Sequence, residues 1–351
     1  MQDALTQMLY SQLQEEASAY TVMIFDQAVV GSAYTHKAGG HEYIYWQIKR
    51  PDGSLWRTSL GRETPELRAK IDGLLQKKRT AEEAIDSLKI ATKAYVASGG
   101  TAIESAHFKV LETLARAGLF NKGVVLVGSH AFAAIGNMLG VQWGSSLKTT
   151  DMDFARQTGI SLAIPDSGET INVPQAIKES DPTFFEIPKL NSRQPSTSMM
   201  SRKTRIKIDF LTTQQNGIDS TPRYYEDLSI AAAPLRYMNY LANSESHRGL
   251  IIGAYPIPVN LPDPARFAIH KLVIAQERTL EKETKSAKDI RQASELIQAL
   301  DELGKELDLR QAISDLITIC GDSAVRNLKA SFARMDENPR SVLQSQFDKA
   351  A

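Results

Sequence analysis

Apolar residues in the middle of the chain are spaced as in short strands and one helix. Residues 123–127 form a glycine-led apolar run, as expected for a buried strand. Residues 131–139 then have a helical pattern, and residues 205–211 alternate apolar with charged side chains. Further short strands are expected at 251–255 and 257–259. Helical segments between short strands predict an α/β (α+β) fold.

The N-terminal part of the chain predicts a helix followed by a β-hairpin. Apolar residues recur at helical spacing in the first twenty residues, at Leu5, Met8, Leu9 and Leu13. An aromatic strand at 42–49 and a second strand at 55–61 flank the turn 51–54, whose Asp-Gly pair is typical of a hairpin. The hairpin carries Arg50, Arg57 and Arg62. These basic residues indicate either a surface that contacts RNA or DNA, or a small sheet with solvated basic edges.

Helical patterns fill the chain on both sides of the central strands. Residues 80–119 are helical in pattern, with a break at 98–100 that is typical of a domain boundary. Asp263 is placed to cap a long helix whose first residue is Pro264, and the remaining sequence is helical. These signals divide the chain into an N-terminal helix and hairpin module, a core and a helical C-terminal region, with bounds 1–99, 100–260 and 261–351.

The composition is that of an ordinary globular protein. Of the 351 residues, 42% are hydrophobic and 23% are charged, and 41 basic residues balance 41 acidic ones. No global positive field therefore favours nucleic acid, although a local patch still could. Cys320 stands alone, which excludes a disulfide framework and a cysteine-rich zinc cluster. No apolar run approaches the ~20 residues that span a bilayer, and no signal-like segment opens the chain, so we expect a cytoplasmic protein without membrane association.

Two acidic residues separated by one position are the strongest chemical signal. In a strand, Asp151 and Asp153 point to one face, while Met152 and Phe154 point to the other. Two carboxylates about 7 Å apart along a strand repel each other unless a cation lies between them. Oxygen ligands of this kind suit Mg²⁺, or Mn²⁺ in its place. We expect Asp151 and Asp153 to bind metal rather than to be solvated surface acids.

A glycine turn and a third acid complete the candidate site. Gly128 and Ser129 join the apolar strand to the following helix, where backbone N–H groups and the helix dipole favour a phosphate. Asp209 lies on the alternating strand with Arg205 and Lys207, which would either neutralise triphosphate charge or pair with the acids. The rival third acid Asp219 lacks such an alternating context. The six histidines are scattered and lack the spacing of a metal site. His130 follows Ser129, where it could contact phosphate, but a structural role is the more frequent one for such a histidine.

This order of motifs resembles the DNA polymerase β-like nucleotidyltransferase superfamily over roughly residues 120–212. The resemblance is based on Gly128-Ser129, Asp151-Met152-Asp153 and Asp209. The resemblance implies a mixed-sheet core in which Asp151, Asp153 and Asp209 bind two Mg²⁺ ions, while Gly128 and Ser129 hold the phosphates of an NTP. The stretch between Ser129 and Asp151 is longer than is usual in the family. We therefore expect this loop to differ from the family more than the metal site does.

The C-terminal part is similar to the AbiEii-type nucleotidyltransferases. The resemblance implies that Lys271 contacts nucleotide phosphate and that Asp289 orients it or helps to activate the acceptor, with Arg278 and Lys288 in support. The alternative is a solvated basic stripe, because Lys271 and Arg278 are seven residues apart and share a helix face. The usual second acid three residues after Asp289 is Gln292 here, which weakens an acid-pair role.

The expected reaction is therefore transfer of an NMP from an NTP to an acceptor hydroxyl. The resemblance implies a tRNA 3′ end or a protein side chain as acceptor, a small molecule such as an antibiotic being another option, and a possible antitoxin partner. The alternative is a catalytically inactive module of the same fold that binds nucleotide or nucleic acid. The intact third acid, Asp209, argues against that alternative. A structural DNA-binding role for the hairpin is disfavoured by the near-neutral pI. The insert 156–201 is expected to lie beside the cleft.

Overall fold

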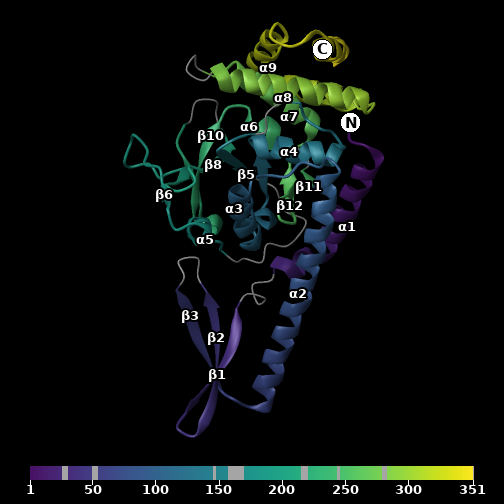
Figure 1. The fold of residues 1–351 in the computed structure, drawn as a ribbon. Helices are drawn as coiled ribbons and strands as arrows, with labels where there is room; N and C mark the ends of the chain where they lie inside the picture. The colour runs from purple at the N-terminus through teal and green to yellow at the C-terminus, as the bar shows by residue number, and fades with distance from the viewer. Residues whose placement is uncertain are drawn as a thin grey trace.

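The computed structural model describes residues 1–25, 31–49, 54–144, 148–156, 170–214, 220–242, 246–278 and 283–350. The expected hairpin turn at 51–53, Arg50, the rival acid Asp219 and part of the insert (157–169) lie outside the described residues. The chain forms a central α/β core with an N-terminal arm at one end and C-terminal helices at the other (Figure 1).

A mixed sheet forms the centre of the core. Its main path runs β4 (Val124–Val127), β5 (Asp151–Arg156), β8 (Lys207–Thr213), β10 (Ile230–Leu235) and β9 (Arg223–Tyr225). Strands β5, β8 and β10 run parallel, whereas β4 and β9 are antiparallel to their neighbours. Strand β7 (Ser198–Ser201) pairs antiparallel with the first half of β8, and β6 (Phe184–Glu186) pairs with β7. The insert before β8 thus extends the sheet beside the candidate site.

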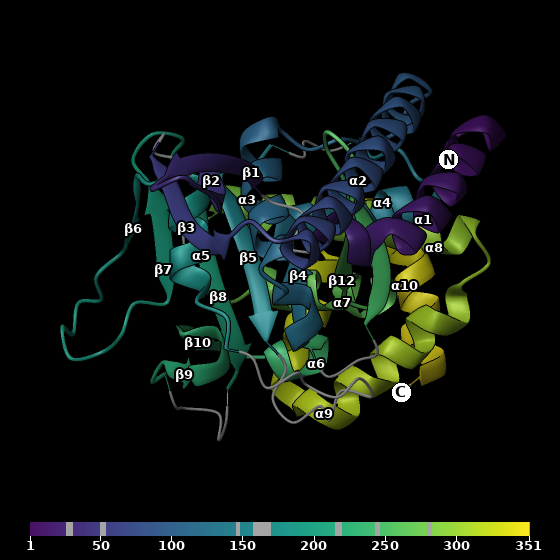
Figure 2. The same ribbon diagram turned by 90° about the horizontal axis from the view of Figure 1, so that it is seen from below.

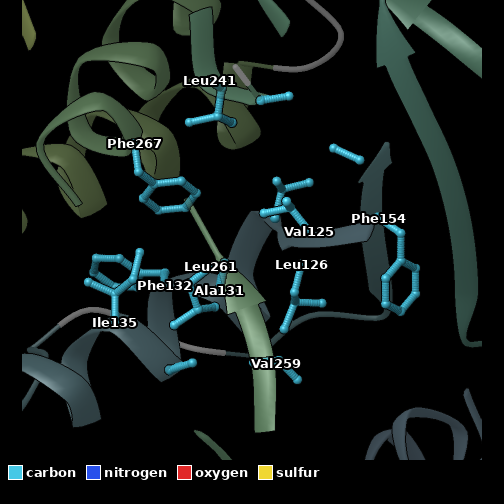
Figure 3. Packing of buried hydrophobic residues seen from close by; sticks show 14 of the residues in the cluster. Val125, Leu126, Ala131, Phe132, Ile135, Phe154, Leu241, Val259, Leu261 and Phe267 are labelled. Atoms are coloured by element: carbon cyan, nitrogen blue, oxygen red, sulfur yellow. The ribbon is translucent and has the colours of Figure 1, made fainter. Parts of the chain in front are cut away.

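Helices cover the sheet and enclose one continuous core. The core helices are α3 (Ser105–Arg116), α4 (Gly128–Leu139), α5 (Val173–Ser180), α6 (Met238–Ala242) and α7 (Pro264–Ala275), with short 3₁₀ turns at Leu119–Lys122 and Glu226–Leu228. The expected strands near 251–259 form the hairpin of β11 (His247–Ile252) and β12 (Pro256–Leu261). Phe132, Phe154, Leu261 and Phe267 bury their side chains in this core (Figure 3). Apolar burial on this scale is the main term that stabilises such a domain.

The N-terminal arm consists of two helices and a small sheet. Helix α1 (Ala4–Phe25) packs along α2 (Pro65–Ala97), and β1 (Ser32–Ala38), β2 (His41–Lys49) and β3 (Leu55–Arg62) form an antiparallel sheet in that order. The expected hairpin is confirmed, and β1 adds a strand to it. The expected apolar face of α1 is wrong in part: Leu5 and Met8 are exposed, and the buried positions are Thr6, Tyr10, Leu13 and Ala17. The apolar spacing of Leu5 and Met8 therefore did not indicate burial.

The C-terminal region is helical, as expected. Helices α8 (Glu283–Glu302), α9 (Glu306–Phe332) and α10 (Glu337–Ala350) lie together on the side of the core away from β6 and β7 (Figure 2). Helix α8 packs against α7, whose N-cap is Asp263 and whose first residue is Pro264. Among the described residues, no helix has the length and apolar character that crossing a bilayer requires. The fold class is therefore confirmed, while the domain bounds at 99 and 260 stay a prediction.

Candidate functional site

Two of the predicted acids face each other across neighbouring strands. In the parallel pairing of β5 with β8, Asp153 lies opposite Asp209, and Asp151 lies opposite Lys207. The intervening Met152 and Ile208 are buried, so the alternation of each strand directs its acids to the opposite face. Asp151, Asp153 and Asp209 therefore share one side of the sheet, as the sequence predicts.

The glycine turn lies directly against this carboxylate pair. Gly128 has φ +70°, in the left-handed region that favours glycine, and a Cβ atom built on it would overlap Oδ2 of Asp153. Helix α4 begins at Gly128, so its unpaired backbone N–H groups lie beside the acids, and Ser129 is half-buried in its first turn. The backbone at Gly128 therefore lies so close to the Asp153 carboxylate that there is no room for a larger residue.

His130, which follows Ser129, is a buried residue. Its ring is buried and lies 4.9 Å from the ring of His107, centroid to centroid. Burial, with the neighbouring His107, lowers the pKa of His130 to about 3, so the ring is neutral at physiological pH. The expectation that this histidine is structural agrees with its burial.

The acids have basic or hydroxyl partners. Nζ of Lys285 lies 2.7 Å from Oδ2 of Asp151, and Nζ of Lys207 lies 2.7 Å from Oδ2 of Asp209. The hydroxyl of Ser198 on β7 donates to Oδ1 of Asp209 at 2.5 Å. Each outer carboxylate is thus oriented by a neighbouring side chain.

Asp153, at the centre, has a perturbed acidity. Burial, together with the negative charges of Asp209 and Asp151, raises the pKa of Asp153 to about 7, against the opposing positive charges of Lys271 and Lys285. Like charges at such short range favour either a proton or a cation between them. Strongly perturbed acidity at a cluster of charged groups is typical of a functional site.

The donor chemistry of this cluster fits a hard divalent cation. The three carboxylates offer oxygen atoms, which Mg²⁺ and Mn²⁺ prefer. Within the described part of the chain, however, no three His, Cys, Asp or Glu side chains are already arranged as a metal site. Lys285 binds one oxygen of Asp151, and Lys207 binds one oxygen of Asp209. These ammonium groups would therefore compete with a cation for the two carboxylates.

Lys271 of α7 and Arg278, just beyond its end, form an ion cluster with Asp289 of α8 rather than a solvated stripe. Asp289 is bound by Nζ of Lys271 at 2.9 Å and by Arg278 at 2.6 Å, and the side chains of Lys271 and Asp289 are 5% and 8% exposed. Burial alone would raise the pKa of Asp289, but Lys271 and Arg278 outweigh it and hold that pKa below its ordinary value. The cluster ties α7 to α8 next to the acids.

Lys288 connects the same helix to the loop before β5. Its ammonium group donates to the backbone carbonyl of Lys148 at 2.9 Å. Burial lowers the pKa of Lys288, and the nearby charge of Lys271 lowers it further, whereas Asp289 and Asp151 oppose the shift. Helix α8 therefore presents Lys285 and Lys288 toward the loop and strand that carry Asp151.

The predicted position of Arg205 is wrong. Strand β8 begins at Lys207, and Arg205 precedes it in a turn with φ +62°, where its backbone N–H donates to the carbonyl of Ser201. The side chain is exposed and does not share a strand face with Asp209. The alternation of charged and apolar residues extends two positions beyond the strand itself, which explains the error.

Two residues of the site were missed by sequence reasoning. Lys285, which binds Asp151, lies 134 positions downstream in the first turn of α8. Ser198, which binds Asp209, is in the insert, where the short β7 lacks a clear alternating pattern. The only local signal was the nearness of Lys285 to the Lys288–Asp289 pair, so both contacts depend on tertiary structure.

Comparison with known proteins gives the family. A model of a family described as nucleotidyltransferase matches residues 105–318, from the start of α3 into α9, which is more than half of the chain. No curated protein and no solved structure shows a significant match. The matched region contains Gly128, the three acids and the Lys271–Asp289 cluster. The chain therefore belongs to this nucleotidyltransferase family and is an enzyme of the class that transfers nucleotidyl groups.

Proposed function

We propose that the protein transfers an NMP from an NTP to an acceptor hydroxyl at Asp151, Asp153 and Asp209. One observation supports this proposal most strongly: Asp153 and Asp209 lie opposite each other on neighbouring strands, and the backbone of Gly128 lies against the carboxylate of Asp153. The acceptor oxygen forms a bond to the α-phosphorus, the bond from that phosphorus to the β-phosphate oxygen breaks, and pyrophosphate leaves. Asp209 would lie on the acceptor side, where its carboxylate would favour loss of the hydroxyl proton to solvent.

The phosphates of the NTP would bind at the N-terminus of α4. Gly128 and Ser129 offer backbone N–H groups and a hydroxyl there, and a helix N-terminus favours an anion. Lys207 and Lys285, which now pair with Asp209 and Asp151, would be available to bind phosphate oxygens if these carboxylates held a metal. Lys271, oriented by Asp289 and Arg278, and Lys288 add positive charge on the same side.

Asp151, Asp153 and Asp209 would hold the divalent ions, Mg²⁺ or Mn²⁺. Such ions stabilise the attacking and leaving oxygens of an in-line displacement. The protein's own part is to position these carboxylates: Ser198 fixes Asp209, and the strand register fixes Asp153 beside it. The raised pKa of Asp153 supports this role, because a carboxylate that resists ionisation alone gains most from a neighbouring cation.

The AbiEii resemblance favours a tRNA 3′ end or a protein side chain as acceptor, with an antitoxin-like protein as partner, and a small molecule is the other acceptor class we consider. The competing function is an inactive nucleotide-binding module of the same fold. Three carboxylates on one side of the sheet, each in a defined environment, favour the enzyme, because a binding module has no use for a third acid.

Transfer of radiolabel tests the proposed reaction. The protein is incubated with Mg²⁺, total RNA or cell lysate, and each NTP labelled on either the α- or the γ-phosphate. We expect α-label to appear on an acceptor and γ-label to appear in pyrophosphate. Asp209→Asn should abolish both kinds of labelling. Asp227→Asn, which removes an ion-pair partner of Arg156 from the 3₁₀ turn Glu226–Leu228, is a control for charge loss elsewhere in the core. Equal labelling by wild type and Asp209→Asn would contradict the proposed site.

A further inference from the structure

The small N-terminal sheet has one face rich in aromatic and basic side chains. In the β1–β2 register Tyr34 lies opposite Tyr45 and His36 lies opposite Tyr43, so these four side chains share a face. Arg62 lies opposite Tyr43 in β3, and the guanidinium carbon of Arg57 lies 5.4 Å from the centroid of the Tyr34 ring. We call this surface the outer face, defined by Tyr34, His36, Tyr43, Tyr45, Arg57 and Arg62.

The rings on the outer face are ordered and accessible. Tyr34 and Tyr45 stack with centroids 5.3 Å apart and planes inclined by 20°, and His36 meets the edge of Tyr45 at 6.3 Å. The three tyrosines are half-buried, while His36, Arg57 and Arg62 are exposed. Because neighbouring side chains already hold these rings in place, stacking of a planar group against them costs little further conformational entropy.

The opposite face of the sheet differs in both charge and burial. It carries Ile44, which is fully buried, and Trp46, and it is the face on which Glu42 pairs with Lys37 at 2.9 Å. Glu42 is the only acidic residue within the three strands, so the outer face has no carboxylate. Ile44 is buried on this face, whereas the outer face carries stacked rings and two exposed arginines, Arg57 and Arg62.

We propose that the outer face binds a single-stranded polynucleotide. Unpaired bases stack on aromatic rings, and arginine side chains contact both the bases and the phosphates; together these contacts give binding that tolerates different sequences. The absence of carboxylates on this face makes its charge complementary to a phosphate backbone. A protein partner with an apolar surface fits less well, because tyrosine, histidine and arginine leave polar atoms across the whole face.

The position of the β1–β3 sheet suggests how bound nucleic acid would be used, an inference that rests on the proposed function. The sheet lies beside the distal half of α2, at the opposite end of the molecule from α8, and outside the residues that the family shares (Figure 1). A polynucleotide that reaches from the outer face to the acids must therefore be long and extended. We infer that the outer face anchors the body of a nucleic-acid acceptor while its end receives the nucleotide.

Fluorescence anisotropy with end-labelled oligonucleotides tests the binding. Single-stranded RNA and DNA of about 15 nucleotides, and a duplex RNA of the same length, are titrated with the full chain. We expect both single strands to bind more tightly than the duplex, with affinity that falls as salt rises. Tyr45→Ala and Arg57→Ala should each weaken single-strand binding by roughly tenfold. The RNA and DNA titrations show which of the two polynucleotides the face prefers.

Matched variants keep the result interpretable. Lys37→Ala removes a cation from the opposite face of the same sheet, and Tyr224→Ala removes an exposed tyrosine from β9; both should bind within about twofold of wild type. Circular dichroism identifies any variant that fails to fold, and the exposed Arg57 then gives the decisive comparison.

Two results would overturn the proposal: wild type that binds no single strand, and outer-face variants that bind as wild type does. Asp209→Asn separates this proposal from the proposed reaction, because it should lose nucleotidyl transfer and keep oligonucleotide binding. If that variant binds while wild type transfers nothing, the reaction is wrong and the binding surface stands.

Discussion

Asp153 and Asp209 lie directly opposite each other on the parallel strands β5 and β8, and the backbone of Gly128 closes against the first of them. Two carboxylates in adjacent strand positions are a cost to folding unless a proton or a cation separates them. The raised pKa of Asp153 is the measurable consequence of that arrangement.

Asp153 should therefore make the metal-free protein less stable as pH rises. Its pKa rises from 3.8 to about 7 on folding, so the folded state holds the proton more tightly than the unfolded chain does. The free energy of unfolding then decreases as pH increases from about 4 to about 7, and Asp153→Asn removes this contribution. We expect the variant to be more stable than wild type at pH 8 by on the order of 1–3 kcal/mol.

Urea unfolding in EDTA at several pH values measures this difference. Identical pH slopes for the wild type and Asp153→Asn would show that the carboxyl group is not perturbed. Addition of Mg²⁺ should then stabilise wild type and leave Asp153→Asn nearly unchanged, because ligand that binds only the folded state raises its stability.

Gly128→Ala should inactivate the enzyme through a clash as well as through backbone strain. A Cβ at this position would overlap the Asp153 carboxylate, so either the acid or the turn must move. Gly304→Ala is the matched control, because Gly304 has a nearly identical φ of +67° and nothing within 4 Å of an added Cβ.

Both substitutions should cost about 1 kcal/mol of strain, but only Gly128→Ala should lower kcat, by about 100-fold or more, since small misplacements of catalytic groups have large effects. Activity and thermal unfolding of the two variants are compared in parallel. Equal activity of both variants would mean that the turn does not approach the reacting groups.

Asp289→Ala should destabilise the protein strongly. The substitution leaves the ammonium group of Lys271 buried without its partner, and removing one member of a buried pair costs about 3–5 kcal/mol. Asp86→Ala, which breaks the exposed pair with Lys89, should cost less than about 1 kcal/mol. Denaturant unfolding distinguishes the two, and a small effect of Asp289→Ala would mean that the cluster does not tie α7 to α8.

Ser198 should act as a positioning residue for Asp209. Its hydroxyl donates to one carboxylate oxygen, so Ser198→Ala removes one restraint and should cost about 1 kcal/mol or less of stability. We expect kcat to fall roughly tenfold while KM for the NTP changes little, since the lost contact orients an acid rather than binds the substrate. Ser198→Thr keeps the hydroxyl and should restore part of kcat. Unchanged kcat in Ser198→Ala would exclude the positioning role.

Much of the core was predictable because its signals are local. The run at 124–127, the alternation at 151–154 and the cap at Asp263 each depend on residues within a few positions, and each was found where expected. Alternation along a strand also placed Asp151 and Asp153 on one face, whereas the convergence of Asp209 with them was implied by the family resemblance.

Features that depend on distant contacts could not be predicted in the same way. The existence of β1 and the choice of the buried face of α1 depend on contacts with segments distant in sequence. In α1, for example, the polar Thr6 is buried while the apolar Met8 is exposed. Arg205 continues the alternating pattern of the sequence but precedes the strand, because the strand pairing of β8 with β5 and β7 begins only at Lys207. Lys271 was ambiguous in sequence, and only its partner Asp289 on the next helix explains its burial.

The most direct test of the central claim is the location of a divalent cation. Crystals of wild-type protein are grown with Mn²⁺ and a non-hydrolysable NTP, and anomalous scattering locates the metal. The account predicts Mn²⁺ bound by carboxylate oxygens of Asp151, Asp153 and Asp209, with Lys207 and Lys285 turned toward phosphate. Manganese bound elsewhere, with both lysines still paired to their aspartates, would contradict it.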